Sequence, residues 1–285
     1  MIATTGFFDG VHLGHRLVIE RLVSLARERG DESLVVTFWP HPRAVLQDGA
    51  RELRLLNSLE EKKALLSNLG VSRVEVLDFT RSFASLTAEE YLRDVLRDRY
   101  GVTTLLVGYD NRLGSDRLTA QTLTPMASAL GIELIELPPY QNISSTKIRK
   151  FLEEGDISSA TGMLGYGYSL KGVVVAGNRL GRTIGFPTAN MKLYEPLKLV
   201  PGRGVYVVDV EVLGKKYRGM TNIGLRPTVG GSSTTIETHI LDFDEDIYGL
   251  PLRIAFLRRL RDEVHFPSLA ALKEQLERDR EACRA

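Results

Sequence analysis

Short apolar runs alternate with amphipathic segments over the first half of the chain. Five of these runs have the length and composition of buried strands: Ile2–Thr5, Leu34–Phe38, Val74–Leu77, Thr103–Val107 and Ile132–Leu137. Segments with helical periodicity separate them, such as Leu17–Arg29 and Leu59–Leu69, and Ser58 with Glu61 predicts a capping box before the second of these. Alternating strands and helices predict a mostly parallel sheet, which binds ligands beyond the carboxyl ends of its strands.

The hydrophobic period changes from about Tyr168 onward. Short runs now follow one another across glycine- and proline-rich joints, and five read as strands: Leu170–Ala176, Val205–Val212, Tyr217–Ile223, Thr234–Leu241 and Leu252–Leu260. This pattern predicts a closed or nearly closed, mainly antiparallel barrel. A helical connector is expected at Thr146–Gly165 and a last helix at Leu269–Glu281. We therefore expect an α/β chain with two domains, residues 1–160 and 161–285.

Composition and charge narrow the classes of partner. The 285 residues carry 37 basic and 36 acidic side chains, a formal net charge of +1, which provides no positive excess for nucleic acid. Cys283 is the only cysteine and cannot form an internal disulfide, as suits a reducing compartment. The sequence shows no secretion signal and no apolar run long enough to span a bilayer. We expect a cytoplasmic protein without nucleic-acid or membrane partners, as a monomer or weak homo-oligomer.

A glycine-rich turn with two histidines follows the first predicted strand. The sequence GFFDGVHLGH places His12 and His15 three residues apart at a helix start, so that they project from one face. Free amides and the helix dipole attract phosphate at such a position, and imidazoles there can stabilise charge that builds on a reacting phosphorus. A ligand phosphate can then attack the ATP α-phosphorus without a protein nucleophile.

Other interpretations of this turn are weaker. The two histidines can be ordinary surface residues of a first helical turn. A dinucleotide-binding dehydrogenase would carry GxGxxG after this strand, and both that motif and a P-loop are absent. A metal site would need a third ligand nearby. Further along, the segment ISSTKIR combines capping hydroxyls with Lys147 and Arg149, as an ordinary helix start does, and together with HxGH it becomes a second side for a triphosphate site.

The barrel half has its own cluster of polar motifs. In GNRLGRTIGFPTAN, glycines spaced by four predict a phosphate-facing loop, and Thr188 and Asn190 offer two oxygen ligands on one side of an extended segment. Such oxygens suit Mg2+. Glu237 lies in an otherwise apolar and hydroxyl-bearing strand, where it is either an outward residue or a base. A kinase acting on an alcohol needs such a base.

The motifs together resemble one known family. GFFDGVHLGH, TFWPHPR, GYD and ISSTKIR, in this order, are similar to the adenylyltransferase module of bacterial bifunctional riboflavin kinase/FAD synthetases, within the HxGH nucleotidyltransferase superfamily. GRTIGFPTAN, NIGLRPT and ETHILDFDEDIYG resemble the riboflavin kinase module of the same family. The resemblance implies a Rossmann-like HxGH domain followed by a riboflavin kinase barrel, with ATP as co-substrate, Mg2+ as cofactor, and riboflavin, FMN and FAD as substrates and products.

The resemblance also implies roles for individual residues. His12 and His15 would stabilise the reacting phosphates, Glu237 would be the base on the 5′-hydroxyl of riboflavin, and Thr188 and Asn190 would hold the metal. Binding of ATP or phosphate is implied for Gly6, Phe8, Asp9, Gly14, Asp110, Ser145, Thr146, Arg149, Gly177, Gly181 and Gly185. Binding of flavin is implied for Pro40, His41, Pro42, Arg43, Asn222, Arg226 and Arg261.

Two alternatives stay open at this point. The family usually follows GYD with a phenylalanine-glycine pair and a basic glycine-rich loop, whereas this chain has NRLGSDRL at residues 111–118, and Phe7 replaces a common asparagine. One alternative is therefore a riboflavin kinase whose first module is impaired or acts on another phosphorylated substrate. The other is a flavin-binding or regulatory protein without turnover, against which PTAN together with Glu237 argues, because binding alone needs no base.

Overall fold

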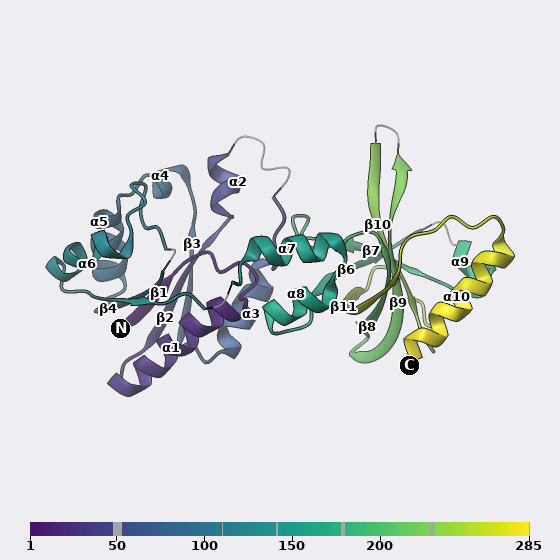
Figure 1. Ribbon diagram of the computed structural model, residues 1–285, viewed down its shortest axis with the longest axis horizontal. Coiled ribbons are helices and arrows are strands. Elements are labelled where there is room, and N and C mark those ends of the chain that lie inside the picture. The colour runs from purple at the N-terminus through teal and green to yellow at the C-terminus, as the bar shows by residue number, and fades with distance from the viewer. Residues whose placement is uncertain (48–52, 110, 141, 178–179, 229–230, 285) are drawn as a thin grey trace. The chain divides into compact units, whose positions relative to one another are not determined.

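The chain folds into two compact units, Met1–Ser145 and Thr146–Ala285 (Figure 1). The computed structural model describes residues 1–47, 53–109, 111–140, 142–177, 180–228 and 231–284. The division between the units falls earlier in the chain than the boundary expected after residue 160, so the helical connector belongs to the second unit.

The first unit is built on a five-stranded parallel sheet, as its pattern of buried runs predicts. Its strands have the order β3-β2-β1-β4-β5, with bounds β1 Ile2–Thr5, β2 Ser33–Trp39, β3 Arg73–Asp78, β4 Thr104–Gly108 and β5 Glu133–Leu137. In the centre, Ala3 pairs with Leu34 on one side and Leu105 on the other. The strand order reverses at β1, so the loops after β1 and β4 leave the sheet at the place where such sheets bind ligands.

Helices cover both faces of this sheet, because alternate strand residues point to opposite sides. On one face Ile2, Val35 and Leu106 pack against α1 (Leu13–Arg29) and α3 (Leu59–Asn68). The opposite face packs against α5 (Ala88–Glu90), the π-helix at Tyr91–Arg99 and α6 (Ala120–Ala129). Two further short helices follow β2 and β3, namely α2 (Pro42–Leu46) and α4 (Arg81–Ala84).

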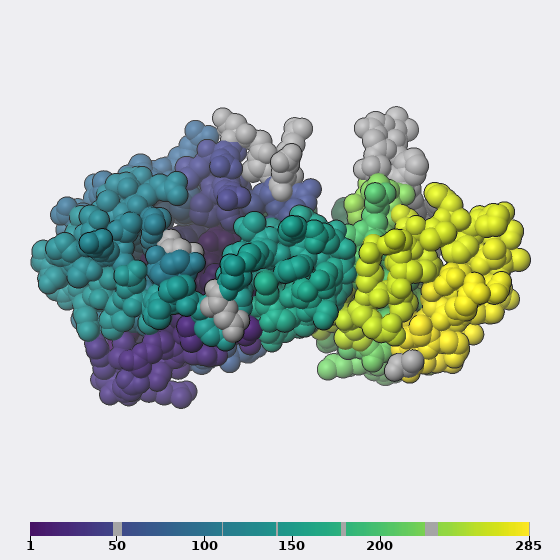
Figure 2. Space-filling model, viewed as in Figure 1, coloured from purple at the N-terminus to yellow at the C-terminus, as the bar shows by residue number. Residues whose placement is uncertain are grey.

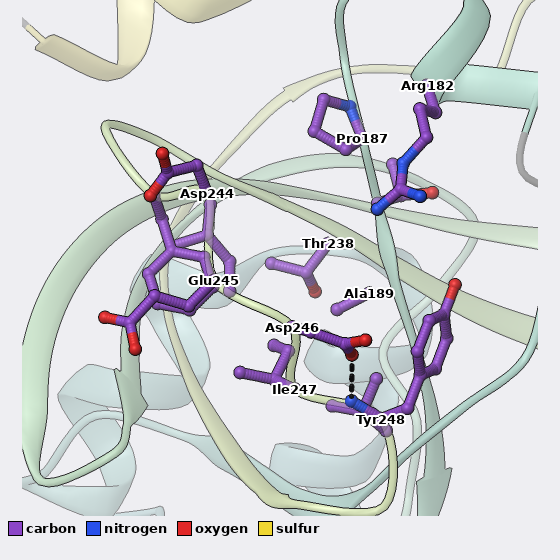
Figure 3. Close-up of a pocket in the computed structure, with 13 residues that line it drawn as sticks. Arg182, Pro187, Ala189, Thr238, Asp244, Glu245, Asp246, Ile247 and Tyr248 are labelled. Atoms are coloured by element: carbon purple, nitrogen blue, oxygen red, sulfur yellow. Dashed lines mark hydrogen bonds between the residues drawn. The ribbon is translucent and has the colours of Figure 1, made fainter.

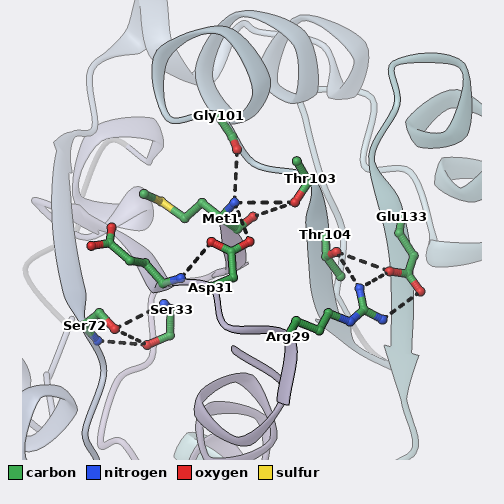
Figure 4. Close-up of polar contacts among 10 residues, drawn as sticks. Met1, Arg29, Asp31, Ser33, Ser72, Gly101, Thr103, Thr104 and Glu133 are labelled. Atoms are coloured by element: carbon green, nitrogen blue, oxygen red, sulfur yellow. Dashed lines mark hydrogen bonds and ion pairs between the residues drawn. The ribbon is translucent and has the colours of Figure 1, made fainter. Parts of the chain in front are cut away.

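Polar contacts close the amino-terminal edge of the sheet (Figure 4). The amino group of Met1 lies 2.8 Å from Oδ2 of Asp31, and Arg29 pairs with Glu133 across α1 and β5. The glycine-rich turn lies at the opposite, carboxyl edge, where sheets of this kind bind ligands.

The second unit combines two helices with a closed barrel. The helices are α7 (Ser145–Glu154), which begins at the last residue of the first unit, and α8 (Ile157–Leu164). The barrel has the strand order β10-β7-β6-β11-β8-β9, with bounds β6 Ser169–Val175, β7 Ala189–Leu193, β8 Gly204–Val212, β9 Lys215–Thr228, β10 Gly231–Ile240 and β11 Pro251–Arg261. The short α9 (Leu180–Thr183) lies in the glycine-rich segment before β7.

The C-terminal helix α10 (Leu269–Arg284) covers one flank of this barrel, together with the segment that follows β11 (Figure 2). Leu276 and Cys283 of the helix pack on barrel residues Val205, Val207 and Met220. Both the parallel sheet with its helices and the antiparallel barrel with its terminal helix confirm the predicted fold class. No helix in the described ranges is long and apolar enough to cross a membrane.

Candidate active sites

The turn after β1 is held in a conformation that few side chains adopt. Phe8, Gly10 and Val11 have φ angles of 53°, 87° and 37°, and non-glycine residues with positive φ mark strain that the surroundings must hold. Asp9 helps to stabilise this conformation, because its buried carboxylate accepts hydrogen bonds from the amides of Leu56 (3.0 Å) and Asn57 (3.3 Å). The Asp9 carboxylate thus supports the turn from within.

His12 and His15 stack on each other at the start of α1. Their ring centroids are 3.6 Å apart with an angle of 16° between the planes. His12 is the N-cap of α1, and its Nδ1 accepts a hydrogen bond from the amide of His15 at 3.3 Å. A Cβ on Gly14 would lie 3.2 Å from Cε1 of His12, so the glycine leaves room for this ring. The sequence prediction that both imidazoles share one face is therefore met.

The surroundings favour the neutral form of His15. Burial holds the pKa of His15 well below its usual value, and the nearby charges of His12 and Lys62 lower it further. Because Nδ1 of His12 accepts a hydrogen bond, a neutral His12 carries its proton on Nε2. Nδ1 of His15 is buried and has no hydrogen-bond partner among the described residues. The pair offers imidazole N–H donors at a helix start, where phosphate binding is favourable.

The other predicted residues of the first site lie in several places. Gly6 precedes the turn, Phe8 lies within it, and the Phe8 ring meets the His15 ring edge-on at 5.3 Å. Ser145 is brought to the turn, since its Oγ donates to the main-chain oxygen of Asp9 at 2.8 Å. Thr146 and Arg149 follow in α7, within the second unit. Asp110 lies outside the described residues.

The predicted flavin-contacting segment lies beside the same turn. His41 caps α2 through a hydrogen bond from the amide of Arg43 to its Nδ1 (3.0 Å), and its ring meets the Phe7 ring edge-on at 4.2 Å. Pro40 and Pro42 flank it, and the Trp39 ring stacks on Phe7 at 6.4 Å. Phe7 therefore connects the histidine turn to the end of β2, where its ring lies against those of Trp39 and His41.

The unusual loop after β4 is ordered by its own contacts. Leu113 and Leu118 exchange main-chain hydrogen bonds of 3.1 and 2.9 Å, and Leu113 is buried in the core. Oδ1 of Asp116 accepts from the amide of Ala88 at 3.0 Å, which joins the loop to α5. Asn111 donates from Nδ2 to the main-chain oxygen of Thr5 (3.3 Å). The departure from the family pattern thus forms a packed turn at the carboxyl edge of the sheet.

In the barrel, three polar side chains line up across neighbouring strands. Glu237 of β10 is paired in register with Asn190 of β7 and with Asn222 of β9. Directly paired residues direct their side chains to the same face of a sheet. Gly177 approaches this row so closely that a Cβ there would lie 2.2 Å from Nδ2 of Asn190. The row combines one carboxylate with two amides on a rigid part of the barrel.

Two cavities meet at Thr188. One, of about 590 Å3, is lined by Glu237, Asn222 and Arg261 together with apolar residues of α10. The other, of about 270 Å3, is lined by Thr188, Arg182 and the acidic segment Asp244–Asp246. In Figure 3, Asp244 and Glu245 lie on one side of this smaller cavity and Arg182 and Tyr248 on the other. Thr188 lines both cavities, so a group held there can contact the contents of each.

The glycines of the segment before β7 allow tight packing. A Cβ on Gly181 would lie 2.2 Å from the main-chain oxygen of Phe186, and Gly185 has a φ of 85°. Gly181 also lines the larger cavity. Arg226 lies in β9, and its side chain lies outside the described part of the chain. These positions agree with a turn that brings the backbone close to a ligand.

Arg261 is fixed at the rim of the larger cavity by a carboxylate. Its Nη2 lies 2.7 Å from Oδ2 of Asp279 in α10, and its Nε lies 3.0 Å from the same oxygen. Asp279 is buried and also accepts from Gln275 (2.8 Å). This ion pair joins β11 to the helix that closes the cavity.

Two site-lining residues escaped the sequence analysis. Nδ1 of His239 donates to the main-chain oxygen of Pro187 (2.8 Å), and burial lowers the pKa of its ring. The signal for His239 was present, since it follows Glu237 by two residues and so shares its face of the strand. Lys62 is fully buried beneath Phe7. Helical periodicity was its only signal, because Lys62 precedes the buried Leu66 by four residues and so shares its face of α3.

Comparisons with known proteins cover the whole chain. The family model described as FAD synthetase matches residues 1–150, and that described as riboflavin kinase matches residues 164–285. A protein named bifunctional riboflavin kinase/FMN adenylyltransferase from Listeria monocytogenes is 36% identical over 289 residues, covering 100% of this chain and 91% of that protein. The protein of the same name from Escherichia coli K12 is 37% identical over 284 residues, covering 98% and 90%.

A solved structure is similar over nearly the same range. The crystal structure of a Streptococcus pneumoniae protein described as a macrolide-efflux protein has a TM-score of 0.93 at 35% sequence identity, and the match covers 99% of this chain and 93% of that chain. The identities and the coverage of both units decide the family. The chain belongs to the family of bifunctional riboflavin kinase/FMN adenylyltransferases.

Proposed function

We propose that the second unit phosphorylates riboflavin to FMN and that the first unit adenylylates FMN to FAD, each with ATP. The observation that carries this proposal is the in-register row of Asn190, Glu237 and Asn222, of which Glu237 and Asn222 line the larger cavity, while Thr188 lines both cavities. A carboxylate at a cavity that adjoins a second one suits transfer of a phosphoryl group to an alcohol.

In the kinase reaction the larger cavity would hold riboflavin and the smaller one ATP. Glu237 would accept the proton of the 5′-hydroxyl as its oxygen bonds to the γ-phosphorus and the bond to the β-phosphate oxygen breaks, releasing ADP. Asn222, Arg226 and Arg261 would orient the flavin. The glycines Gly177, Gly181 and Gly185 would let the backbone approach the phosphates of ATP.

The residues beside this site fit a magnesium ion. The hydroxyl of Thr188 and the amide oxygen of Asn190 are hard oxygen ligands, which suit Mg2+ bound together with substrate phosphates and waters. No group of three or more His, Cys, Asp or Glu side chains capable of holding a metal occurs in the described parts of the chain, so hydroxyl and amide donors are the better assignment. Bound there, Mg2+ would offset the negative charge of the phosphates.

In the adenylyltransferase reaction the phosphate of FMN would attack the α-phosphorus of ATP. A new phosphoanhydride bond forms, the α–β bond breaks, and pyrophosphate leaves. His12 and His15 would donate hydrogen bonds to the reacting phosphates. Gly6, Phe8, Asp9 and Gly14 shape their turn, while Asp110, Ser145, Thr146 and Arg149 would complete the ATP site. Pro40, His41, Pro42 and Arg43 would contact the flavin or its phosphate.

We also propose the setting in which these reactions run. Both require ATP, which supports a cytoplasmic location. The near balance of 37 basic and 36 acidic residues supports small-molecule partners alone, without nucleic acid or membrane, and a monomer or weak homo-oligomer as the working form. The domain carrying each activity would be residues 1–160 for adenylyl transfer and 161–285 for the kinase.

Labelled ATP tests the two reactions separately. Purified protein is incubated with riboflavin, Mg2+ and ATP radiolabelled at either the γ- or the α-phosphorus, and the flavins are separated. The proposal expects γ-label in FMN and in the FAD made from it, and α-label in FAD alone. Label from the α-phosphorus in no flavin would remove the adenylyltransferase assignment, and absence of γ-label would remove the kinase assignment.

A further inference from the structure

A lysine is buried in the first unit beside the histidine turn. Lys62 lies in α3 and has an exposed fraction of 0%. A buried ammonium group is costly unless its surroundings compensate for the lost water. No carboxylate among the described residues forms an ion pair with it, and the neighbouring Asp9 is engaged with main-chain amides. The position of Lys62 therefore calls for a function other than an ordinary salt bridge.

The contacts of Lys62 converge on Phe7. Its Nζ lies 3.5 Å from the centroid of the Phe7 ring and 5.7 Å from that of Trp39, within the range of a cation–π interaction. The same Nζ is 3.4 Å from Oγ1 of Thr37, which donates to the main-chain oxygen of Phe7 at 3.2 Å. Lys62 thus acts on Phe7 twice, through its ring and, by way of Thr37, through its carbonyl group.

Phe7 is the first residue of the strained turn that leads to the histidines. The unusual φ angles of Phe8, Gly10 and Val11 follow it directly, and His12 comes next. Strained backbone persists only where neighbours hold it in place. Lys62 holds the beginning of this turn, and Asp9 holds its middle.

The charge of Lys62 acts on the same site. The titratable groups that influence it or respond to it are Asp9, which favours its charged form, and His15, whose pKa it helps to lower. Burial lowers the pKa of Lys62 itself to about 8. A cation beside a helix N-terminus increases the attraction for phosphate groups.

We propose that Lys62 is a positioning residue for adenylyl transfer, which fixes the Phe7–Val11 turn and supplies positive charge that favours binding of the ATP phosphates. The inference rests on the adenylyltransferase assignment of the first unit. The side chain of Lys62 contacts Phe7 and Thr37. It acts on the reaction through these two residues and through its electrostatic field.

Three variants test it, with the second unit as an internal control. Lys62→Met removes the charge and keeps most of the volume, Lys62→Arg keeps the charge, and Lys63→Met changes the exposed neighbour. The rate of FAD formation from FMN and ATP gives kcat and KM for ATP, and the rate of FMN formation from riboflavin reports the kinase. We expect Lys62→Met to lower kcat/KM for ATP in FAD formation on the order of 100-fold, Lys62→Arg to restore part of it, and Lys63→Met to change nothing.

The pH profile separates a charge effect from a packing effect. Lysine loses its charge as pH rises through its pKa, so kcat/KM for adenylylation by the unmodified enzyme should fall above about pH 8. Lys62→Arg should keep its activity to higher pH because a guanidinium group stays charged. The kinase reaction of the same samples should lack this difference between variants.

The outcomes are distinguishable. Wild-type kcat/KM and an unchanged alkaline limb in Lys62→Met would overturn the proposal. So would an equal loss of activity in Lys62→Met and Lys62→Arg with one shared pH profile, since that marks a packing role only. If Lys62→Met does not fold, the pH profiles of the unmodified enzyme and Lys62→Arg still test the proposal. Loss of kcat/KM at the same alkaline pH in both would contradict it. A wild-type enzyme that makes no FAD would instead refute the adenylyltransferase assignment.

Discussion

The stacked rings of His12 and His15 lie at a helix N-terminus, where the helix dipole and imidazole N–H groups both favour negative charge. Glu237 lies between two amides on a barrel wall. In the proposed function, the first arrangement would stabilise charge on phosphates that react with each other, and the second would accept a proton from an alcohol. Different side chains would then serve the two phosphorus chemistries.

Replacing the histidines should stop only one reaction. His15→Ala removes a donor to the reacting phosphates, so FAD formation should fall by roughly 100-fold or more. His12→Asn keeps an acceptor able to cap α1, and its rate of FAD formation should fall by a similar factor. Chromatography of flavins over time measures both products. FMN formation from riboflavin by the same samples serves as the control, and FAD formation at the wild-type rate in both variants would remove the histidines from the mechanism.

Replacing the proposed base should stop the other reaction. Glu237→Gln keeps the size and hydrogen-bonding reach of the side chain and removes its ability to accept a proton, so phosphorylation of riboflavin should slow by about 100-fold or more. The affinity for ATP with Mg2+, measured by equilibrium binding, should change little. FAD formation from added FMN should continue. Undiminished turnover would show that Glu237 is an outward strand residue without a catalytic role.

Residue identity was predictable where a motif carries it and not where packing decides. HxGH and PTAN specify their residues by spacing, and the structure places them at a helix start and beside two cavities. Lys62 and Lys63 have the same side chain, and only the spacing of Lys62 from Leu66 on α3 distinguishes the buried one. The carboxylate of Asp9, implied as a phosphate-binding residue, turns inward to main-chain amides, which spacing alone does not reveal.

At the scale of elements, the buried ion pair between Arg261 and Asp279 contributes to holding α10 against the barrel. Asp279→Ala leaves the Arg261 guanidinium without its partner, so the second unit should lose about 3 kcal/mol of stability. The KM for riboflavin should rise as well, because Arg261 lines the larger cavity. Thermal denaturation and kinase kinetics measure the two effects. Glu274→Ala breaks an exposed ion pair with Arg278 in the same helix and is the matched control. Equal stability of both variants would contradict this account of α10.

The glycine-rich segment before β7 offers a second test at this scale. In Gly177→Ala the new methyl group would lie 2.2 Å from Nδ2 of Asn190, so Asn190 must move out of its row with Glu237. Kinase activity should fall at least 10-fold, while FAD formation from FMN stays constant. Gly162→Ala in α8, where a Cβ meets nothing within 4 Å, is the control. An active Gly177→Ala enzyme would show that the close approach has no catalytic importance.

Elements with strong periodicity were predictable, and short ones were not. The buried runs of the sheet and barrel appear where the sequence placed them, and the capping box of Ser58 and Glu61 forms. β7 was anticipated only as an extended segment, because its sequence ANMKL lacks the apolar run that marked the other strands. The π-helix at Tyr91–Arg99 and the helix α6 with Pro125 inside it depend on tertiary packing that no local pattern encodes.

At the scale of the whole molecule, two units carry consecutive reactions, since the product of the second unit is the substrate of the first. The order of motifs along the chain was enough to predict both modules. The contacts that order the loop at residues 111–118 were not predictable, since they join Asp116 to α5, far away in the sequence. The match of residues 1–150 to the FAD synthetase family, and not this loop, is what favours both activities over an impaired first module.

The central claim is that one chain carries both activities, and a single time course tests it most directly. Purified protein is mixed with riboflavin, ATP and Mg2+, and samples are separated by chromatography as the reaction proceeds. The account predicts that FMN appears first and that FAD follows as FMN declines. Accumulation of FMN without FAD, or no conversion of riboflavin at all, would contradict it.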